Sequence, residues 1–296
     1  MRKILIIILF SLMCALNVNA TSIEEIYIDS EVEIAGGLYI KQIISVKDQN
    51  EDLKIKLYQK DNSLKKFNND EESLYSSDIY NPSGAKLFKV GIVKEDANIN
   101  EYNNDDFYDN NVSEIEYEVE EDNNSYIIVF PKTNEDVICY LEYTVLNILV
   151  EHNDSAEFYY RYIDNFGYDV KSIDIITTLP YSSELFKVWA HGSKNMKGSL
   201  DSKRSIVHSE IINYKKDEYL DNRILFDKGL FAININEHKK SNMDAIELIE
   251  KIENERLNNT KNNNILKIAL VISLSLLILS IVVYFIYTKF KKRRNC

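Results

Sequence analysis

The sequence predicts a mainly β protein, with an extracellular antiparallel β-sandwich, a short juxtamembrane helix and one transmembrane helix. Three observations predict this fold class. Short runs of alternating apolar and polar residues follow one another from Ile23 onward, bounded by turn residues. A helical period does not appear before residue 240. An uncharged apolar run then extends from Ile268 to Tyr287. Whether the strands form one large sandwich or two in tandem is left open by the pattern.

The apolar run has the length of a membrane-spanning helix. At 1.5 Å of rise per residue, a helix from Ile268 to Tyr287 is about 30 Å long, which matches the hydrocarbon core of a bilayer. Lys289 to Arg294 form a basic cluster directly after it. Cationic residues favour the cytoplasmic side, so we predict a transmembrane helix over residues 265–288 and a cytoplasmic tail over 289–296. The bilayer is thus the predicted partner of this run. The alternative is a buried helix of a soluble core.

The N-terminus predicts a secretory signal peptide over residues 1–20. Arg2 and Lys3 precede an apolar run from Ile4 to Leu16, and Val18-Asn19-Ala20 fits the small-residue cleavage rule. The alternative is an uncleaved second span. Both ends therefore predict a single-pass protein of the plasma membrane, with its N-terminal domain outside.

Net charge excludes one class of partner. The chain carries −12, and without the two cations of residues 1–20 and the six of residues 265–296 the external part carries −20. Nucleic-acid binders present basic surfaces, so a nucleic-acid partner is excluded. The acidity suits solubility at a cell surface or association with cationic partners.

The cysteines predict an external domain without disulfides. Cys14 lies in the signal peptide and Cys296 in the cytoplasmic tail, which leaves Cys139 as the one external cysteine. The external part is long enough to bury a core without disulfide bonds, and exported chains of this kind are typical of bacteria.

Alternation predicts the individual strands of the sandwich, over residues 21–240. Gly36 and Gly37 predict a hairpin between the first two. The predicted strands are Ile23 to Ile34, Leu38 to Val46, Leu53 to Tyr58, Glu114 to Glu120, Ser125 to Phe130, Val137 to Val150, Ala156 to Ile163, Val170 to Leu179, Phe186 to Ala190, Ile206 to Tyr214 and Arg223 to Phe226. Residues 59–113 are less regular, and the acidic stretch from Asn98 to Asn111 is interpreted as a long surface loop.

One amphipathic helix is predicted between the sandwich and the membrane, within residues 241–264. Ala245, Leu248, Ile249 and Ile252 share one face. The apolar face is too short to indicate a coiled coil, and the polar residues 258–264 predict a tether.

Residues 137–231 carry a resemblance to a known family. The stretches that carry it are Tyr140 to Asn147, Asn153 to Tyr160, Ile173 to Pro180, Trp189-Ala190-His191-Gly192, Gly198 and Ile224 to Phe226. In this order they resemble the bacterial family of predicted membrane proteins called domain of unknown function twenty-two-zero-seven. The resemblance implies a signal peptide, an extracellular β domain, a short helical segment and a membrane anchor. It implies no catalytic residues. Residues 47–112 depart from the family pattern, and the long Gly-rich cytoplasmic tail of many members is missing.

His191 is the residue most suited to chemistry, because a histidine before Gly192 at a strand end can act as base or ligand. Catalysis requires a nucleophile or carboxylate beside it, and Asp154 and Glu157 are the candidates that the fold can bring there. The alternative role is to stabilise a turn. Trp189 is expected to anchor the core. We therefore take Asp154, Glu157, Trp189, His191 and Gly192 as candidate interaction or structural residues and predict no catalytic residue.

The sequence predicts no cofactor and no metal site. Asp96, Asn98 and Asn100 imitate the start of an EF-hand loop, but Glu101 replaces its glycine and Phe107 its final glutamate. The remaining acidic groups leave weak calcium binding as an alternative. Nucleotide loops and serine-hydrolase motifs are absent from the sequence.

These observations favour a noncatalytic bacterial surface protein whose sandwich binds a protein or envelope-polymer partner, or belongs to an envelope assembly. Two alternatives from other classes stay open. One is a membrane-tethered envelope hydrolase that uses His191 and nearby acids. The other is an accessory or sensor subunit of a membrane complex.

Overall fold

The computed structural model describes residues 21–59, 81–230 and 239–258, apart from residues 103, 105, 123, 165 and 194. The predicted signal peptide and the predicted transmembrane helix lie outside the described residues. Within the described residues no helix is both long and apolar enough to cross a membrane. The chain divides into two units, one up to Ala245 and one from Ile246.

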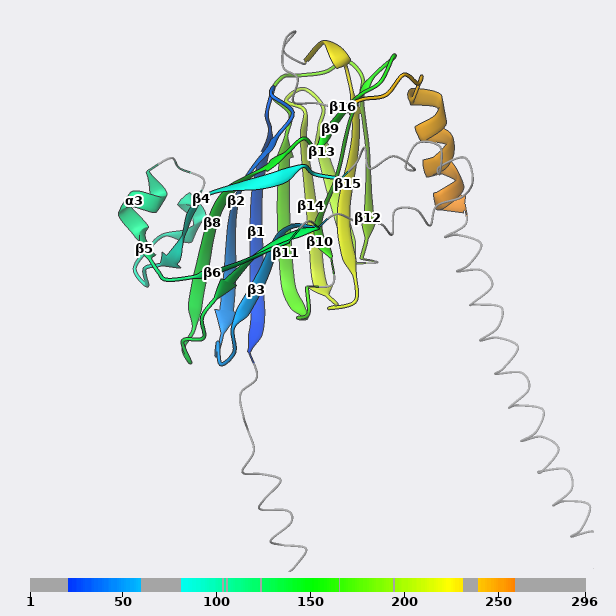
Figure 1. Cartoon of the computed structure of the whole chain (residues 1–296). Helices are drawn as coiled ribbons and strands as arrows, with labels where there is room; N and C mark the ends of the chain where they lie inside the picture. Colours follow the sequence, from blue (N-terminus) through cyan, green and yellow to red (C-terminus); the bar gives the residue numbers. More distant parts are fainter. Residues whose placement is uncertain are drawn as a thin grey trace, which may run out of the picture. The chain divides into compact units, whose positions relative to one another are not determined.

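The first unit consists of strands in three sheets (Figure 1). An eight-stranded sheet has the order β13-β14-β11-β1-β2-β8-β4-β5, a five-stranded sheet the order β12-β15-β10-β9-β16, and a three-stranded sheet the order β3-β7-β6. The strands are β1 (Ser22–Val32), β2 (Leu38–Lys47), β3 (Leu53–Gln59), β4 (Gly84–Val93), β5 (Val112–Glu114), β6 (Glu118–Glu121), β7 (Ser125–Phe130), β8 (Val137–Leu146), β9 (Leu149–Glu151), β10 (Ala156–Asp164), β11 (Val170–Thr178), β12 (Phe186–Gly192), β13 (Met196–Asp201), β14 (Ile206–Tyr214), β15 (Tyr219–Phe226) and β16 (Lys239–Lys240).

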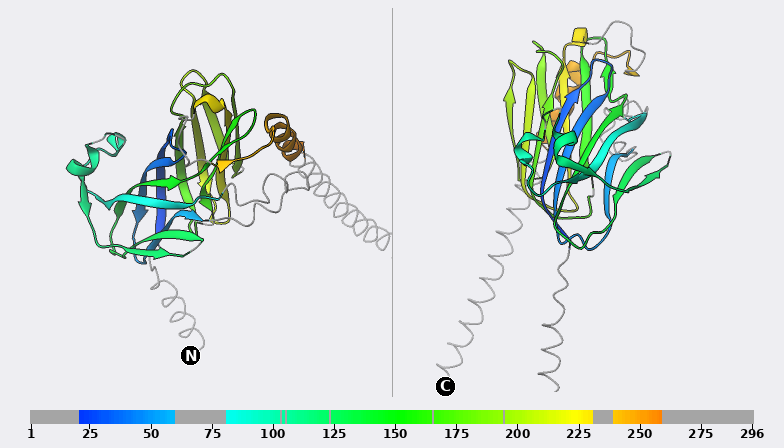
Figure 2. Two further views of the ribbon diagram at one scale, coloured as in Figure 1. Left: turned by 45° about the horizontal axis from the view of Figure 1, so that its top comes forward. Right: turned by 90° about the vertical axis from the view of Figure 1, so that its left-hand side faces the viewer.

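One hydrophobic core joins the three sheets. Ile26 of the eight-stranded sheet, Ile55 of the three-stranded sheet and Phe158 of the five-stranded sheet belong to the same buried cluster. Figure 2 shows the smaller sheets packed against the large one. The described strands therefore build one sandwich, which answers the question that the sequence left open between one and two.

Period-two alternation places the apolar side chains in this core. In β1, Ile26, Ile28 and Val32 are at most 2% exposed, and they alternate with more exposed polar residues. The hairpin to β2 turns at Gly36, whose φ of 93° favours glycine. The predicted mainly β fold is confirmed.

Two of the three sheets are mixed, so the prediction of an antiparallel sandwich is wrong for these two. β1 pairs with β11 in parallel, with Ile23 opposite Val170, and β16 pairs with β9 in parallel. No hairpin fixes the direction of the first pair. The chain leaves the large sheet after β8, passes through β9 and β10 in the five-stranded sheet, and returns as β11 beside β1.

Several strand boundaries differ from the prediction. β8 and β9 are separated at Asn147, whose φ of 55° is a left-handed conformation that asparagine tolerates. β15 begins at Tyr219, four residues earlier than predicted, and β4, β13 and β16 were not predicted.

The acidic stretch 98–111 is not a simple surface loop. It contains a short 3-10 helix, η2 (Ile99–Glu101), and a short helix, α3 (Phe107–Asn111). Tyr102 and Phe107 are buried, in a second apolar cluster with Ile43 and Tyr140 on the outer face of the large sheet. These two aromatic side chains hold the acidic segment against that sheet. The acidic composition of the segment had indicated a solvent-exposed loop instead.

The second unit contains the predicted amphipathic helix, over residues 246–258. Ile249 and Ile252 on its apolar face are buried, whereas Glu247 and Lys251 are exposed. Ala245 precedes the helix. The other predicted domain boundaries stay predictions.

A buried hydroxyl cluster connects the five-stranded sheet to the large sheet. The hydroxyl of Tyr162 in β10 lies 2.7 Å from Ser30 Oγ in β1 and 2.7 Å from Thr177 Oγ1 in β11. Burial raises the pKa of the Tyr162 hydroxyl, so it stays protonated and bonds both neighbours as a neutral group.

We expect Tyr162→Phe to lower the free energy of unfolding by about 1–2 kcal/mol, because two buried hydroxyl groups lose a partner. Urea unfolding of the full chain in mild detergent measures this. Tyr168→Phe is the matched control, because its exposed hydroxyl bonds Glu51 and its loss should cost at most about 0.5 kcal/mol. Equal losses in the two variants would contradict a stabilising role for the cluster.

Candidate functional site

Charged side chains occupy one face of the five-stranded sheet, across β10, β15 and β12. The register places Tyr159 and Trp189 opposite Arg223, and Arg161 and His191 opposite Asp221. Directly opposed residues share a face, and alternate residues such as Phe158 and Ile224 point into the core. We call the polar set the charged ladder; its members are Glu157, Tyr159, Arg161, His191, Asp221, Arg223 and, from the turn after β9, His152.

The first part of the charged ladder is a fully buried ion pair. Arg223 Nε donates to Glu157 Oε1 at 2.6 Å, and both side chains are 0% exposed. His152 Nε2 lies 2.9 Å from the other carboxylate oxygen of Glu157 and is equally buried. A buried charge is tolerated only with such partners, so these three residues depend on one another.

The second part is centred on Asp221, whose side chain is 1% exposed. Its Oδ1 lies 2.7 Å from His191 Nδ1, and its Oδ2 lies 3.4 Å from both Arg161 Nη2 and the Tyr159 hydroxyl. Asp221 therefore fixes the orientation of the imidazole ring of His191. Tyr159 joins the two parts, because its ring lies 5.1 Å from the guanidinium of Arg223.

Access to solvent is limited to the end of the ladder at Asp221. The His191 side chain is 14% exposed and that of Arg161 is 20% exposed, whereas Glu157 and Arg223 are inaccessible. Only the His191 and Arg161 end can meet a ligand from solution. Chemically, an oriented imidazole can accept or donate a proton, or hydrogen-bond a polar partner.

Gly192 has a steric role beside the ladder. Its φ is 129°, and a Cβ atom there would lie 1.7 Å from the backbone oxygen of Tyr219. β12 and β15 approach so closely at this point that a side chain cannot be accommodated. Gly192 thereby allows His191 to reach Asp221.

Asp154 and Trp189 were candidates to lie with His191. Asp154 Oδ1 accepts hydrogen bonds from Ser155 Oγ and from the backbone N–H of Ala245. Trp189 is partly exposed on the ladder side, whereas its neighbour Val188 packs against the core. The expected position of Trp189 in the core is therefore wrong, because strand alternation turns it to the other face.

The structure brings Glu157 and His191 onto one face but gives them different partners. Sequence reasoning missed Asp221, Arg223 and Tyr159 as members of the site. The sequence contained a signal for Asp221 and Arg223, because Asp221, Arg223 and Leu225 occupy alternate positions, as residues on one face of a strand do. Asp and Asn are depleted in strands, and the predicted strand began only at Arg223, after Asp221 and Asn222.

Asp227 anchors the start of β12 to the end of β15. Its Oδ2 accepts hydrogen bonds from Ser183 Oγ at 2.8 Å, Glu184 N at 2.8 Å and Leu185 N at 3.1 Å. Desolvation raises the pKa of the Asp227 carboxyl, but these hydrogen bonds outweigh it and leave the pKa below its ordinary value of 3.8. The ionised form therefore stabilises the fold.

We expect Asp227→Asn to lower the urea midpoint at pH 7 and to have less effect as the pH falls below about 4. The pKa of the Asp227 carboxyl is lower in the folded protein than in the unfolded chain, so its ionised form stabilises the fold at a pH above the unfolded pKa. This stabilisation is lost as the pH falls through the folded pKa. Urea unfolding at pH 7, 4 and 3 measures the difference. If the difference in urea midpoint between wild type and Asp227→Asn did not change with pH, the proposed role of the ionised carboxylate would be contradicted.

The described residues contain no group of three or more His, Cys, Asp or Glu side chains that could hold a metal ion. Cys139 is buried, and burial raises the pKa of its thiol, which keeps it protonated and unreactive.

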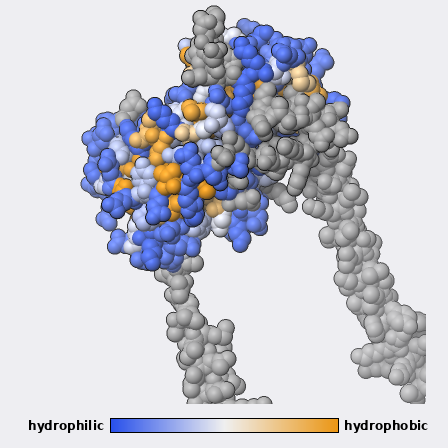
Figure 3. Space-filling view, viewed as in Figure 1, coloured by the Kyte–Doolittle hydropathy of each residue, from blue (hydrophilic) through white to orange (hydrophobic). Residues whose placement is uncertain are grey.

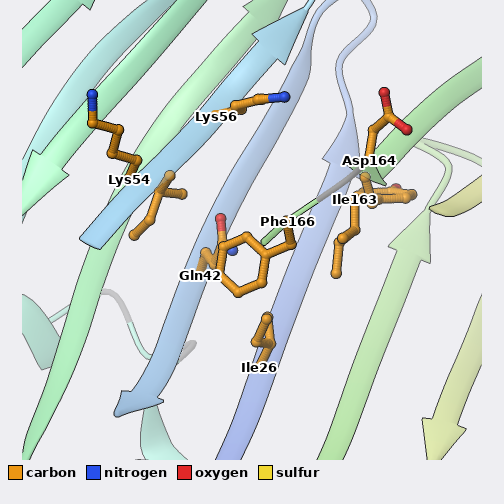
Figure 4. Close-up of a pocket in the computed structure, with 9 residues that line it drawn as sticks. Ile26, Gln42, Lys54, Lys56, Ile163, Asp164 and Phe166 are labelled. Atoms are coloured by element: carbon orange, nitrogen blue, oxygen red, sulfur yellow. The ribbon is translucent and has the colours of Figure 1, made fainter. Parts of the chain in front are cut away.

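A small cavity lies where the three sheets meet (Figure 4). Ile26, Gln42, Tyr162 and Ile163 line it, together with Phe166, whose ring lies between Gln42 and Ile163. Lys54 and Lys56 extend away from that ring at the rim. Its volume of about 40 Å³ holds water but is too small for an organic ligand.

Comparison with known proteins identifies the family. The sequence profile of a family described as a predicted membrane protein (DUF2207), N-terminal domain, matches residues 17–226. The chain belongs to this family. The match includes residues 47–112, which were expected to depart from the family pattern. The predicted resemblance to DUF2207 is confirmed.

Two solved structures show distant similarity to the chain. A proposed protease from Parabacteroides distasonis has a TM-score of 0.37 and 11% identity, covering 69% of this chain and 40% of that chain. An M1 zinc metallopeptidase from Deinococcus radiodurans has a TM-score of 0.34 and 8% identity, covering 69% of this chain and 42% of its own. The chain thus spans less than half the length of either protein. At such TM-scores these similarities have no bearing on activity. No curated protein matches the chain.

Proposed function

We propose that this DUF2207 protein is a noncatalytic, single-pass protein of a bacterial plasma membrane that presents its sandwich outside the cell to bind a partner. The apolar run from Ile268 to Tyr287 and the basic cluster after it support the anchor and its orientation. Membership of a family of predicted membrane proteins supports a membrane location.

The observation that carries the noncatalytic role is the burial of the charged ladder. Glu157 and Arg223 are 0% exposed and bind each other, and Asp221 is 1% exposed. A substrate cannot reach groups that are buried in this way. Their pairing across β10, β15 and β12 instead stabilises the five-stranded sheet. Other surfaces of the sandwich are then available to bind a partner.

Topology provides the direct test. In intact cells, an external protease should remove the sandwich, while an epitope placed after Cys296 should become accessible to antibody only after permeabilisation. A cytoplasmic C-terminal tag that remains attached to a membrane fragment is the internal control. Protection of the sandwich from external protease would overturn the proposal.

The membrane-tethered hydrolase is the second candidate, favoured by the 2.7 Å contact between Asp221 and the partly exposed His191. We expect His191→Ala to leave the turnover of wall polymer unchanged in cells. His208→Ala is the matched control, because His208 contacts Asp174 on the large sheet. Loss of turnover in the first variant alone, with an unchanged melting temperature, would favour the hydrolase.

A further inference from the structure

A groove on the three-stranded sheet is far larger than the cavity beside Phe166. Its volume is about 510 Å³, within the range of roughly 300–1,000 Å³ that ligand sites occupy. Its apolar lining consists of Ile115, Tyr117, Val129 and Pro131. Tyr117 is 41% exposed, so an aromatic face is available beside the groove.

Carboxylates surround this apolar lining. Asp52, Glu116 and Glu118 also line the groove, and all three are exposed. Asp52 accepts a hydrogen bond from the backbone N–H of Lys132 at 3.0 Å, which fixes its position. Apolar lining with an acidic rim is complementary to a lysine or arginine side chain, whose stem packs on apolar surface while its charged end stays at the rim.

The groove continues into an open sheet edge. Glu118 begins β6, which pairs only with β7 among the described strands, in the order β3-β7-β6. All four residues of β6 are exposed, and Val119 is 44% exposed. A strand with one neighbour presents backbone N–H and C=O groups that can bind an extended chain. Figure 3 shows a band of hydrophobic surface where Figure 1 labels β4 and β6, on an otherwise mainly hydrophilic face.

Charge identifies the kind of chain that fits. β6 contains Glu118, Glu120 and Glu121, so the β6 edges of two copies of this protein repel each other. Lys54 pairs with Glu120 at 2.6 Å, which shows that a cation fits beside this strand. The register places Glu118 and Glu120 on the same face as Val129 of the groove. A partner strand with cations at alternate positions would therefore match this face.

We infer that β6 and the adjoining groove bind an extended cationic segment of an envelope protein by strand addition. One arginine or lysine side chain of that segment enters the groove, packs on Val129 and Pro131, and contacts the Tyr117 ring by a cation–π interaction. Its charged end pairs with Glu116 and Glu118. The inference rests on the proposed function, because it names the surface and partner chemistry of the external sandwich.

The test uses the full chain in mild detergent and a fluorescent, capped hexapeptide of alternating arginine and valine. Fluorescence anisotropy should show saturable binding. Tyr117→Ala and Glu118→Lys should each weaken it at least about tenfold, because both side chains are placed at the contact. Asp217→Lys is the matched control, since Asp217 is exposed in the turn between β14 and β15 and its substitution changes the charge equally. We expect it to change binding less than about twofold.

A second peptide separates strand addition from simple charge attraction. The same hexapeptide with N-methyl groups at alternate residues keeps its charge but loses backbone donors, and it should bind at least about tenfold more weakly. Equal binding of the two peptides, equal effects of Glu118→Lys and Asp217→Lys, or no saturable binding would each overturn the inference. The protease-accessibility result is independent of these outcomes, so failure here leaves the external location intact. Melting temperatures of the exposed-site variants should match that of the wild type, which verifies folding.

Discussion

Replacing Arg223 with methionine is expected to lower the free energy of unfolding by about 3–5 kcal/mol, because it leaves the buried carboxylate of Glu157 without its arginine partner. The pair is 0% exposed on both sides, with a contact of 2.6 Å. His152 still contacts the other oxygen of that carboxylate. Methionine retains much of the aliphatic part of the arginine side chain. The loss of unfolding free energy therefore reflects the missing charge and hydrogen bond more than lost packing. Urea unfolding of the full chain in detergent measures the change.

The exposed pair of Lys54 and Glu120 supplies the control. Its N–O distance is also 2.6 Å, but the two side chains are 56% and 47% exposed. Lys54→Met should therefore cost at most about 1 kcal/mol, since solvent screens the pair in both states. The double variant Glu157→Leu with Arg223→Met should recover part of the loss of Arg223→Met, because it also removes the buried carboxylate that has lost its arginine partner. If Arg223→Met and Lys54→Met lowered the free energy of unfolding equally, burial would not increase the contribution of the Glu157–Arg223 pair to stability.

The strands of the core could be predicted because burial on one face imposes a period of two. In β1 and β2 every isoleucine, leucine and valine of the sequence is buried in the structure, together with the polar residues Ser30, Lys41 and Gln42, and the hairpin at Gly36 required a glycine. β13 could not be found in this way. Its sequence MKGSLD has little apolar alternation and its residues are largely exposed, so the strand depends on pairing with β14 rather than on its own pattern.

The charged ladder shows why a site is harder to predict than a strand. His191 and Glu157 could be selected from the sequence by residue type, but their partners Asp221 and Arg223 are set by the register of β15 against β12 and β10. Alternating charges in a strand are normally interpreted as a solvent face. Only the structure shows that this polar face is buried and paired.

Gly192→Ala is expected to destabilise the protein by about 3 kcal/mol, through both backbone strain and a steric clash. The φ of Gly192 is 129°, which L residues rarely adopt, and the new Cβ would lie 1.7 Å from the backbone oxygen of Tyr219. Relief of that clash must move the start of β15 away from β12. Such a shift also lengthens the contact between His191 and Asp221, so the variant should alter the chemical shifts of the His191 ring.

Two other glycines separate the causes of this loss. Gly167 has a φ of +89° but no neighbouring atom within 4 Å of an added Cβ, so Gly167→Ala should cost only about 1 kcal/mol from backbone strain. Gly198 has its nearest neighbour at 3.4 Å, which is ordinary contact, and Gly198→Ala should be nearly neutral. Urea unfolding should rank the variants in the order Gly198→Ala, Gly167→Ala and Gly192→Ala. If Gly192→Ala cost no more than Gly167→Ala, β12 and β15 would be able to separate freely. The closeness of these two strands would then not be what keeps His191 against Asp221.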